Sequence, residues 1–201
     1  MGGIYLGVFT PTEAAGIGAG GALIIGLSRR SLSFGGILET LVDTARTSGM
    51  LFCVVIGAFI FSDFITRAGL PDTLLSLVTA LELSPMLVIM VILVIYVLLG
   101  MVFESLSMLL LTVPVFYPLV SSLGFDLVWF GIVVVVVTEI SLITPPVGMN
   151  VFVLSAVLKD VKAGTIFKGV TPFWCADIVR LFIIVFIVPV SMFLPQFLYD
   201  Q

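Results

Sequence analysis

Long apolar runs follow one another along this sequence, with only short polar connections between them. Hydrophobic residues make up 61% of the 201 residues, and charged residues only 10%. A soluble globule of this size needs a largely polar surface, and these residues are too few to provide one. A membrane-spanning helix needs roughly 20 apolar residues, so the chain has room for about five or six membrane segments. We therefore expect an all-α polytopic membrane protein embedded in a lipid bilayer.

The residue types also exclude several functional classes. The sequence contains no histidine, so it lacks the commonest transition-metal ligand and the commonest general base. We expect no transition-metal site. No pair of nucleophile and base is visible, which argues against an enzyme. The net charge of −4 without a basic patch argues against a nucleic-acid partner. Cys53 and Cys175 lie in or beside apolar runs, which favours buried thiols without a disulfide.

The first clear helix start is the motif Thr10-Pro11-Thr12-Glu13. Thr10 suits the cap, proline fits the first turn, and Glu13 can reach back to the amide of Thr10. This capping accounts for Glu13, and a gating role in transport is the alternative. Arg29-Arg30 ends the helix on the cytoplasmic side by the positive-inside rule. Residues 1–49 are thus expected to form a scaffold helix and an amphipathic helix, from Phe34 to Ser48, lying at the interface.

The next two regions are expected to differ in how they enter the membrane. Residues 50–84 should form one membrane helix and a surface helix on the periplasmic side. In residues 85–126, two apolar stretches are separated only by Glu104-Ser105. No loop that short joins two complete spans, so we expect a re-entrant hairpin with both arms opening to the periplasm. One helix with a buried glutamate is the alternative.

The last third of the sequence predicts a discontinuous helix and a final span. Residues 127–158 are too long for one straight span, and Thr144-Pro145-Pro146-Val147-Gly148 interrupts them. A lysine-rich segment follows, so this element should end in the cytoplasm. Residues 159–201 are then a cytoplasmic connection and a final membrane helix, kink-prone near Pro189. Asp177 and Arg180, three residues apart in that helix, are expected to pair with each other.

The double proline is the sharpest indication of a binding site. Proline has no amide hydrogen, so the carbonyls of Ser141 and Leu142, four residues earlier, should lose their helical partners. Free carbonyls at membrane depth are tolerated only where they face protein or a polar cavity, and with a helix C-terminal dipole they suit a desolvated Na⁺. A merely kinked span is the alternative. The predicted Na⁺ ligands are Ser105, Thr144, Pro145, Pro146 and Gly148.

The hairpin tip is expected to complete this site. Ser107 and Asn150 are the candidates for contacting an anionic substrate. Glu104 either caps the second arm or acts in gating, since an ionisable group in a membrane segment is often functional. Glu139 could bond a neighbouring helix rather than ligate an ion. We expect no cofactor besides the coupling ion, Na⁺.

Three segments also resemble a known family. The segment from Gly2 to Ala15, GGIYLGVFTPTEAA, resembles the start of the second half of the large membrane subunit of TRAP transporters, the tripartite ATP-independent periplasmic systems. GMVFES at 100–105 and LITPPVGMN at 142–150 are similar to the family's hairpin tip and broken helix, in the family's order. The similarity covers essentially the whole chain. One departure is Glu104, where the family usually has aspartate.

The resemblance implies a fold, a function and partners. The fold is one inverted repeat of an elevator-type ion transporter, in the bacterial inner membrane. The function is Na⁺-coupled import of organic acids of the C4-dicarboxylate or sialic acid type. The partners are a periplasmic substrate-binding protein, the small TRAP membrane subunit and the family's N-terminal repeat, which is missing here, so a truncated or split subunit is expected. A symporter of the same architecture without a binding protein, and a scaffold remnant that transports nothing, are the alternatives.

Overall fold

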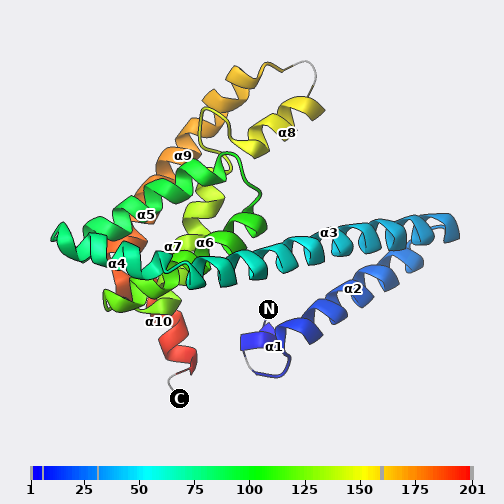
Figure 1. Ribbon diagram of the computed structural model, residues 1–201. Helices are drawn as coiled ribbons and strands as arrows, with labels where there is room; N and C mark the ends of the chain where they lie inside the picture. Colours follow the sequence, from blue (N-terminus) through cyan, green and yellow to red (C-terminus); the bar gives the residue numbers. More distant parts are fainter. Residues whose placement is uncertain (1, 6, 31, 159–160, 200–201) are drawn as a thin grey trace. The chain divides into compact units, whose positions relative to one another are not determined.

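The computed structural model describes residues 2–5, 7–30, 32–158 and 161–199, and every regular element in these ranges is a helix (Figure 1). The chain divides into two compact units, residues 1–53 and 54–200. The first unit contains α1 (Gly2–Tyr5), α2 (Pro11–Ser28) and the beginning of α3 (Phe34–Arg67). The second contains the rest of α3, α4 (Leu70–Ala80), α5 (Pro85–Gly100), α6 (Ser105–Ser122), α7 (Leu127–Ser141), α8 (Met149–Val157), α9 (Ala163–Phe186) and α10 (Val188–Tyr199).

The predicted capping box is present at the start of α2. The amide of Glu13 donates to Thr10 Oγ1 at 3.3 Å, and the amide of Thr10 donates to Glu13 Oε2 at 2.8 Å. Pro11 occupies the first turn, where its missing amide hydrogen has no cost. Capping therefore accounts for Glu13, and its gating role stays a prediction.

Helix α3 differs from the prediction of two separate elements. It runs without interruption from Phe34 to Arg67, across the expected boundary between residues 49 and 50. No proline lies within it, and the hydroxyl of Thr44 donates to the carbonyl of Thr40 at 2.7 Å without disturbing the helix. The prediction of a helix from Phe34 to Ser48 is therefore confirmed, but the helix does not end at Ser48.

Among the helices of the described residues, three are long and apolar enough to cross a membrane, namely α3, α6 and α9. Four shorter helices, α4, α5, α7 and α10, are also apolar. The expectation of a multi-pass membrane protein is thus confirmed. Helix α2 is not among the candidate spans, because its polar first turn and its glycines lower its hydropathy.

Both cysteines are free thiols, but their expected burial is wrong. Cys53 and Cys175 are exposed on the surface of the fold. Apolar runs in a membrane protein face lipid or other protein as often as a core, so hydrophobicity alone does not predict burial inside this chain.

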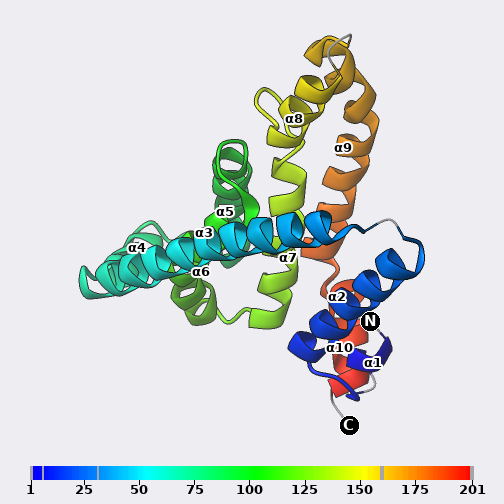
Figure 2. The same ribbon diagram turned by 90° about the vertical axis from the view of Figure 1, so that its right-hand side faces the viewer.

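Helix α7 lies at the centre of the second unit and packs against α5, α6, α9 and α10 (Figure 2). Its residues Trp129, Val133 and Val137 are at most 1% exposed. The indole of Trp129 donates to the carbonyl of Ile184 at 3.1 Å and so fastens α7 to α9. Close packing and hydrogen bonds of this kind hold membrane helices together, since lipid provides little hydrophobic drive between them.

Helices α5 and α6 form a helical hairpin. Tyr96 and Thr112 lie equally far on either side of Glu104, and their hydroxyls are 2.7 Å apart. The hydroxyl of Thr112 donates its one proton to the carbonyl of Met108 at 2.7 Å, so Tyr96 is the donor between the two arms. Residues 101–104 are not helical. The alternative of one continuous helix through Glu104 is therefore wrong.

Candidate functional site

The predicted interruption between α7 and α8 extends from Leu142 to Gly148. Gly148 has φ of 53°, in the left-handed region that favours glycine. A Cβ atom there would lie 3.3 Å from the carbonyl oxygen of Thr144 and 3.3 Å from Cε1 of Phe167. A side chain at 148 would therefore strain the backbone and crowd both neighbours. Glycine lets the chain turn back into α8.

The two carbonyls that were expected to be free have found other partners. The carbonyl of Ser141 accepts from the amide of Thr144 at 3.1 Å, and that of Leu142 accepts from the amide of Asn150 at 3.1 Å. The prediction that both lack a donor is therefore wrong. The prolines do remove the helical donors, but a tight turn and the returning chain replace them. Asn150 thus holds the turn closed through its amide, while its side chain is exposed.

The free carbonyls lie slightly further along the chain. Within the described residues, the carbonyls of residues 143–147 accept no hydrogen bond. Pro145 and Pro146 are exposed, whereas Thr144 and Gly148 are buried. The carbonyl of Gly148 accepts from Val151 at 2.8 Å, so it is occupied at the start of α8. Of the predicted ligands in the break, Thr144, Pro145 and Pro146 retain free carbonyl oxygens.

The hydroxyl of Thr144 is engaged on both sides. It donates to the carbonyl of Ile140 at 2.7 Å. It accepts from the indole nitrogen of Trp174, on α9, at 2.9 Å. The sequence gives no sign of this second bond, because the two residues are 30 positions apart and no local pattern connects them.

At the hairpin tip, Glu104 caps α6. Its Oε1 accepts from the amide of Leu106 at 3.0 Å and its Oε2 from the amide of Ser107 at 3.0 Å. The hydroxyl of Ser107 also donates to Oε2, at 3.1 Å. These bonds account for a carboxylate at this position, so a gating role is not needed to explain it. Ser105 is half-buried, and its hydroxyl makes no hydrogen bond within the described residues.

The base of the tip lies directly against the end of α7. Gly100 closes α5, and a Cβ atom added to it would overlap Oγ and Cβ of Ser141. Ser141 is fully buried, and its hydroxyl donates to the carbonyl of Thr138 at 2.5 Å. The fold thus brings the two predicted parts of the site together at Gly100 and Ser141. No hydrogen bond of the described residues joins Ser105 or Ser107 to the break.

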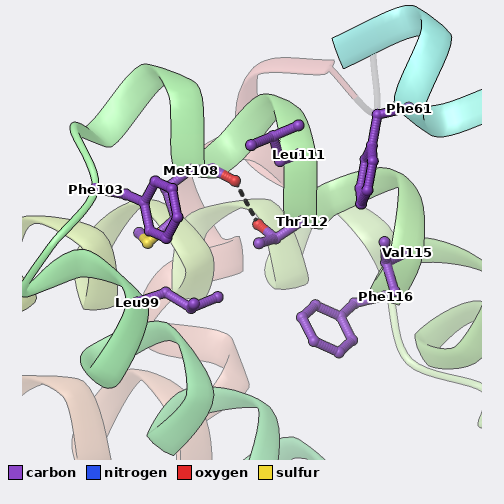
Figure 3. A pocket seen from close by; sticks show the side chains of 8 residues that line it. All are labelled: Phe61, Leu99, Phe103, Met108, Leu111, Thr112, Val115 and Phe116. Atoms are coloured by element: carbon purple, nitrogen blue, oxygen red, sulfur yellow. Dashed lines mark hydrogen bonds between the residues drawn. The ribbon is translucent and has the colours of Figure 1, made fainter. Parts of the chain in front are cut away.

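A cavity of about 220 Å³ lies between the hairpin arms and α3 (Figure 3). Thr112 is its one lining residue with a hydroxyl, and that hydroxyl is bonded to Met108 and Tyr96. An organic acid needs donors or cations for its charge, so this cavity has the wrong chemistry for such a substrate. The lining residues are Phe61, Leu99, Phe103, Met108, Leu111, Thr112, Val115 and Phe116.

The apolar helices α7 and α9 carry four charged side chains in the described residues, namely Glu139, Lys168, Asp177 and Arg180. Arg180 Nη2 is 3.1 Å from Asp177 Oδ1, so these two form the predicted pair. Glu139 is exposed on α7, and within the described residues its carboxylate has no ion pair or hydrogen bond. A carboxylate on a membrane helix usually faces protein or water rather than lipid.

Replacing Glu104 by alanine is expected to lower the free energy of unfolding by about 1 kcal/mol, because two amides at the start of α6 lose their acceptor. Replacing Glu104 by aspartate, a preferred capping residue, should retain most of the free energy of unfolding that alanine loses. Thermal unfolding of the purified protein in detergent measures both changes. The control is Glu39→Ala, since Glu39 is an exposed carboxylate in α3. Equal unfolding curves for Glu104→Ala and wild type would contradict the capping role.

The chain is similar to a family of membrane transport proteins. The family model described as tripartite ATP-independent periplasmic transporter, DctM component, matches residues 1–190. The C4-dicarboxylate TRAP transporter large permease protein DctM of Pseudomonas aeruginosa is 35% identical over 199 residues, which are 98% of this chain and 46% of that protein.

Two further relatives have other substrates in their names. The sialic acid TRAP transporter large permease protein SiaM of Vibrio cholerae is 35% identical over 198 residues, which are 98% of this chain and 44% of that protein. The 2,3-diketo-L-gulonate TRAP transporter large permease protein YiaN of Escherichia coli is 34% identical over 188 residues, which are 93% of this chain and 44% of that protein. The chain spans less than half the length of these relatives.

Proposed function

The chain belongs to the family of DctM components of tripartite ATP-independent periplasmic transporters, and from this membership we propose that it forms one Na⁺-binding half of a large permease subunit. The permease imports an organic acid, coupled to Na⁺, across a bacterial inner membrane. The relatives named for C4-dicarboxylate and sialic acid support this substrate class.

The observation that carries the proposal is the run of free carbonyls at residues 143–147, between the C-terminus of α7 and the N-terminus of α8. Carbonyl oxygens and the partial negative charge of a helix C-terminus favour a cation. Amides and the partial positive charge of a helix N-terminus favour an anion. The break thus offers free carbonyls for Na⁺ beside the start of α8, whose partial positive charge favours a carboxylate nearby although the amides of residues 150–152 are already bonded.

The order of events follows from the charges. Na⁺ settles first against the carbonyls of Thr144, Pro145 and Pro146, with Ser105 from the hairpin tip as a further ligand. The cation then offsets the charge of the organic acid, which is costly to carry through a medium of low dielectric constant. Ser107 and Asn150 are proposed to contact the acid. Binding of both permits an elevator movement of the hairpin and the broken helix.

The proposed partners are a periplasmic binding protein, the small TRAP membrane subunit and a second repeat of the large subunit. Two features support a protein partner beside this chain. Glu139 is an exposed carboxylate on an apolar helix without a partner in the described residues, and such a group calls for a polar neighbour. The free carbonyls also supply only one side of an ion cage.

The α5–α6 hairpin is proposed to be re-entrant, so that Ser122 at the end of α6 lies on the periplasmic side and Lys162 before α9 lies in the cytoplasm. We expect single cysteines at these two positions to react with impermeant reagents from opposite sides of the membrane. The background is a variant with Cys53 and Cys175 replaced by serine, since both native thiols are exposed. Reaction of both positions from the same side would contradict the hairpin topology.

The test of the proposed function is uptake into vesicles that contain the complete permease assembly with this chain. Labelled succinate and labelled N-acetylneuraminate are the two probes. We expect uptake of one of them only when the periplasmic binding protein is added outside the vesicles. Uptake at the same rate without that protein would instead indicate a symporter that needs no binding protein, and no uptake under any condition would favour the scaffold alternative.

A further inference from the structure

We propose that Trp174 is a positioning residue for the Na⁺ site, because its indole holds Thr144 so that this residue offers the ion its carbonyl oxygen and not its hydroxyl. This inference rests on the proposed function. It assigns a role to a residue of α9, a helix that contributes none of the predicted ligands.

The first step concerns the hydroxyl of Thr144. A hydroxyl has one proton and two acceptor lone pairs. Its proton is donated to the carbonyl of Ile140 at 2.7 Å, and one lone pair accepts from the indole of Trp174 at 2.9 Å. Thr144 is only 6% exposed. An oxygen that already accepts an N–H has that donor's partial positive charge beside it, which disfavours a cation there. The carbonyl of Thr144, which accepts no hydrogen bond within the described residues, carries no such penalty.

The second step concerns the position of α9 along the break. Trp174 contacts the beginning of the break at Thr144, and Phe167 lies 3.3 Å from the place of a Cβ on Gly148 at its end. Residues seven positions apart lie on the same face of a helix, about two turns from each other. One face of α9 therefore lies against the break at both Thr144 and Gly148, and in the chain the free carbonyls of residues 144–147 lie between these two points.

An empty space lies beside the hydrogen bond between Trp174 and Thr144. A cavity of about 200 Å³ separates the break from α9, and it is lined by Ile143, Pro145, Phe167, Val170, Thr171 and Trp174. The break is thus not packed tightly against α9 over its whole length. Within the described residues, the bond from Trp174 to Thr144 is the one hydrogen bond between α9 and the break. Without it, the peptide groups at 143–147 would have room to rotate, and the ion would have to order them on binding.

The test is a Na⁺ titration of uptake by the complete assembly, for Trp174→Phe and Thr144→Val. Each variant removes the bond between the two side chains and keeps most of the side-chain shape, and Thr144→Val also removes the bond from the hydroxyl to the carbonyl of Ile140. Loss of one net hydrogen bond is expected to raise the half-saturating Na⁺ concentration about fivefold in Trp174→Phe, and Thr144→Val should raise it at least as much. The double variant should titrate like Thr144→Val alone, because Trp174→Phe removes a bond that Thr144→Val has already removed. Thr144→Ser keeps the hydroxyl and should restore the wild-type value.

The matched control is Trp129→Phe. It removes an indole bond of similar length, 3.1 Å to the carbonyl of Ile184, which joins α7 to α9 near the start of α7 and not at the break. Its half-saturating Na⁺ concentration should equal that of the wild type, even where less protein folds. At saturating Na⁺, the half-saturating substrate concentration should be unchanged in the variants at 174 and 144. A purely structural role would lower the maximal rate of all variants alike and leave the Na⁺ titration unmoved.

Failure of the positioning role of Trp174 can be distinguished from failure of the proposed Na⁺-coupled transport. If wild-type uptake depends on Na⁺ but Trp174→Phe titrates like the wild type and like Trp129→Phe, the positioning role is overturned and the proposed function stands. If Thr144→Val loses Na⁺ dependence altogether while Trp174→Phe does not, the hydroxyl is itself a ligand and the inference is overturned. If wild-type uptake is independent of Na⁺, the proposed function and this inference fail together.

Discussion

Replacing Pro145 and Pro146 together by alanine is expected to raise the half-saturating Na⁺ concentration for uptake by about tenfold or more, a loss of about 1.4 kcal/mol. Alanine supplies two amides, which can donate to the carbonyls of Ser141 and Leu142 in helical geometry. These carbonyls now accept from Thr144 and Asn150, so the new donors would replace the turn by helix. The carbonyls at 143–147 would then enter the helix ladder and leave the ion.

A substitution with a smaller expected effect tests the contribution of the hairpin tip to the same Na⁺ site. Ser105→Ala removes one hydroxyl among about five or six oxygen ligands and leaves the carbonyl framework intact, so its effect on Na⁺ affinity should be milder. Combined with the proline replacements, it should add little, because the site is already lost. The measurement is the Na⁺ titration of uptake with protein amount in the membrane as control. An unchanged Na⁺ titration in the double-proline variant, with the protein inserted, would reduce the break to a structural kink.

The second large effect is expected for Gly100→Ala. A Cβ at Gly100 would overlap the side chain of Ser141, which is fully buried and already bonded to Thr138. Because Ser141 has no room to move, α5 and α7 must separate. Overpacking of this kind costs about 1–3 kcal/mol, and here it also displaces the hairpin tip from the break. We expect little folded protein and no measurable uptake.

A second substitution at Ser141 should compensate for the larger side chain at position 100. Ser141→Gly removes both atoms that the new Cβ would overlap and leaves Cε of Met108 at 3.4 Å, an ordinary contact, so the pair Gly100→Ala with Ser141→Gly should recover folding and part of the uptake. The control is Gly131→Ala in the middle of α7, where an added Cβ meets nothing within 4 Å. Normal folding and uptake in Gly100→Ala alone would contradict the close contact between the hairpin and the broken helix.

The features that the sequence predicts well are those set by neighbours in the chain. The capping box of Thr10 and Glu13, the cap at Glu104 and the pair of Asp177 with Arg180 each need only three or four residues and the geometry of one helix turn. The interruption after α7 is also local, since proline cannot donate to the helix wherever it stands. Each of these features appears in the structure at the expected residues.

The features that the sequence does not predict depend on how distant segments meet. Ser141 and Leu142 were expected to have free carbonyls, but the turn within the break and the amide of Asn150 satisfy them, a matter of how the chain folds back. The bond of Trp174 to Thr144 joins residues 30 positions apart. The only hint of the contact at Gly100 is a glycine at the end of an apolar run, where close approach of a neighbour is one reason among several.

Whether this chain serves a Na⁺-driven importer can be measured as accumulation of substrate in vesicles under two cation gradients. Vesicles with the complete assembly and the periplasmic binding protein receive an inward Na⁺ gradient, or a choline gradient of equal size, together with labelled succinate or N-acetylneuraminate. We expect accumulation of one substrate above its outside concentration with Na⁺ and none with choline. Equal accumulation under both gradients would show that Na⁺ does not drive the import.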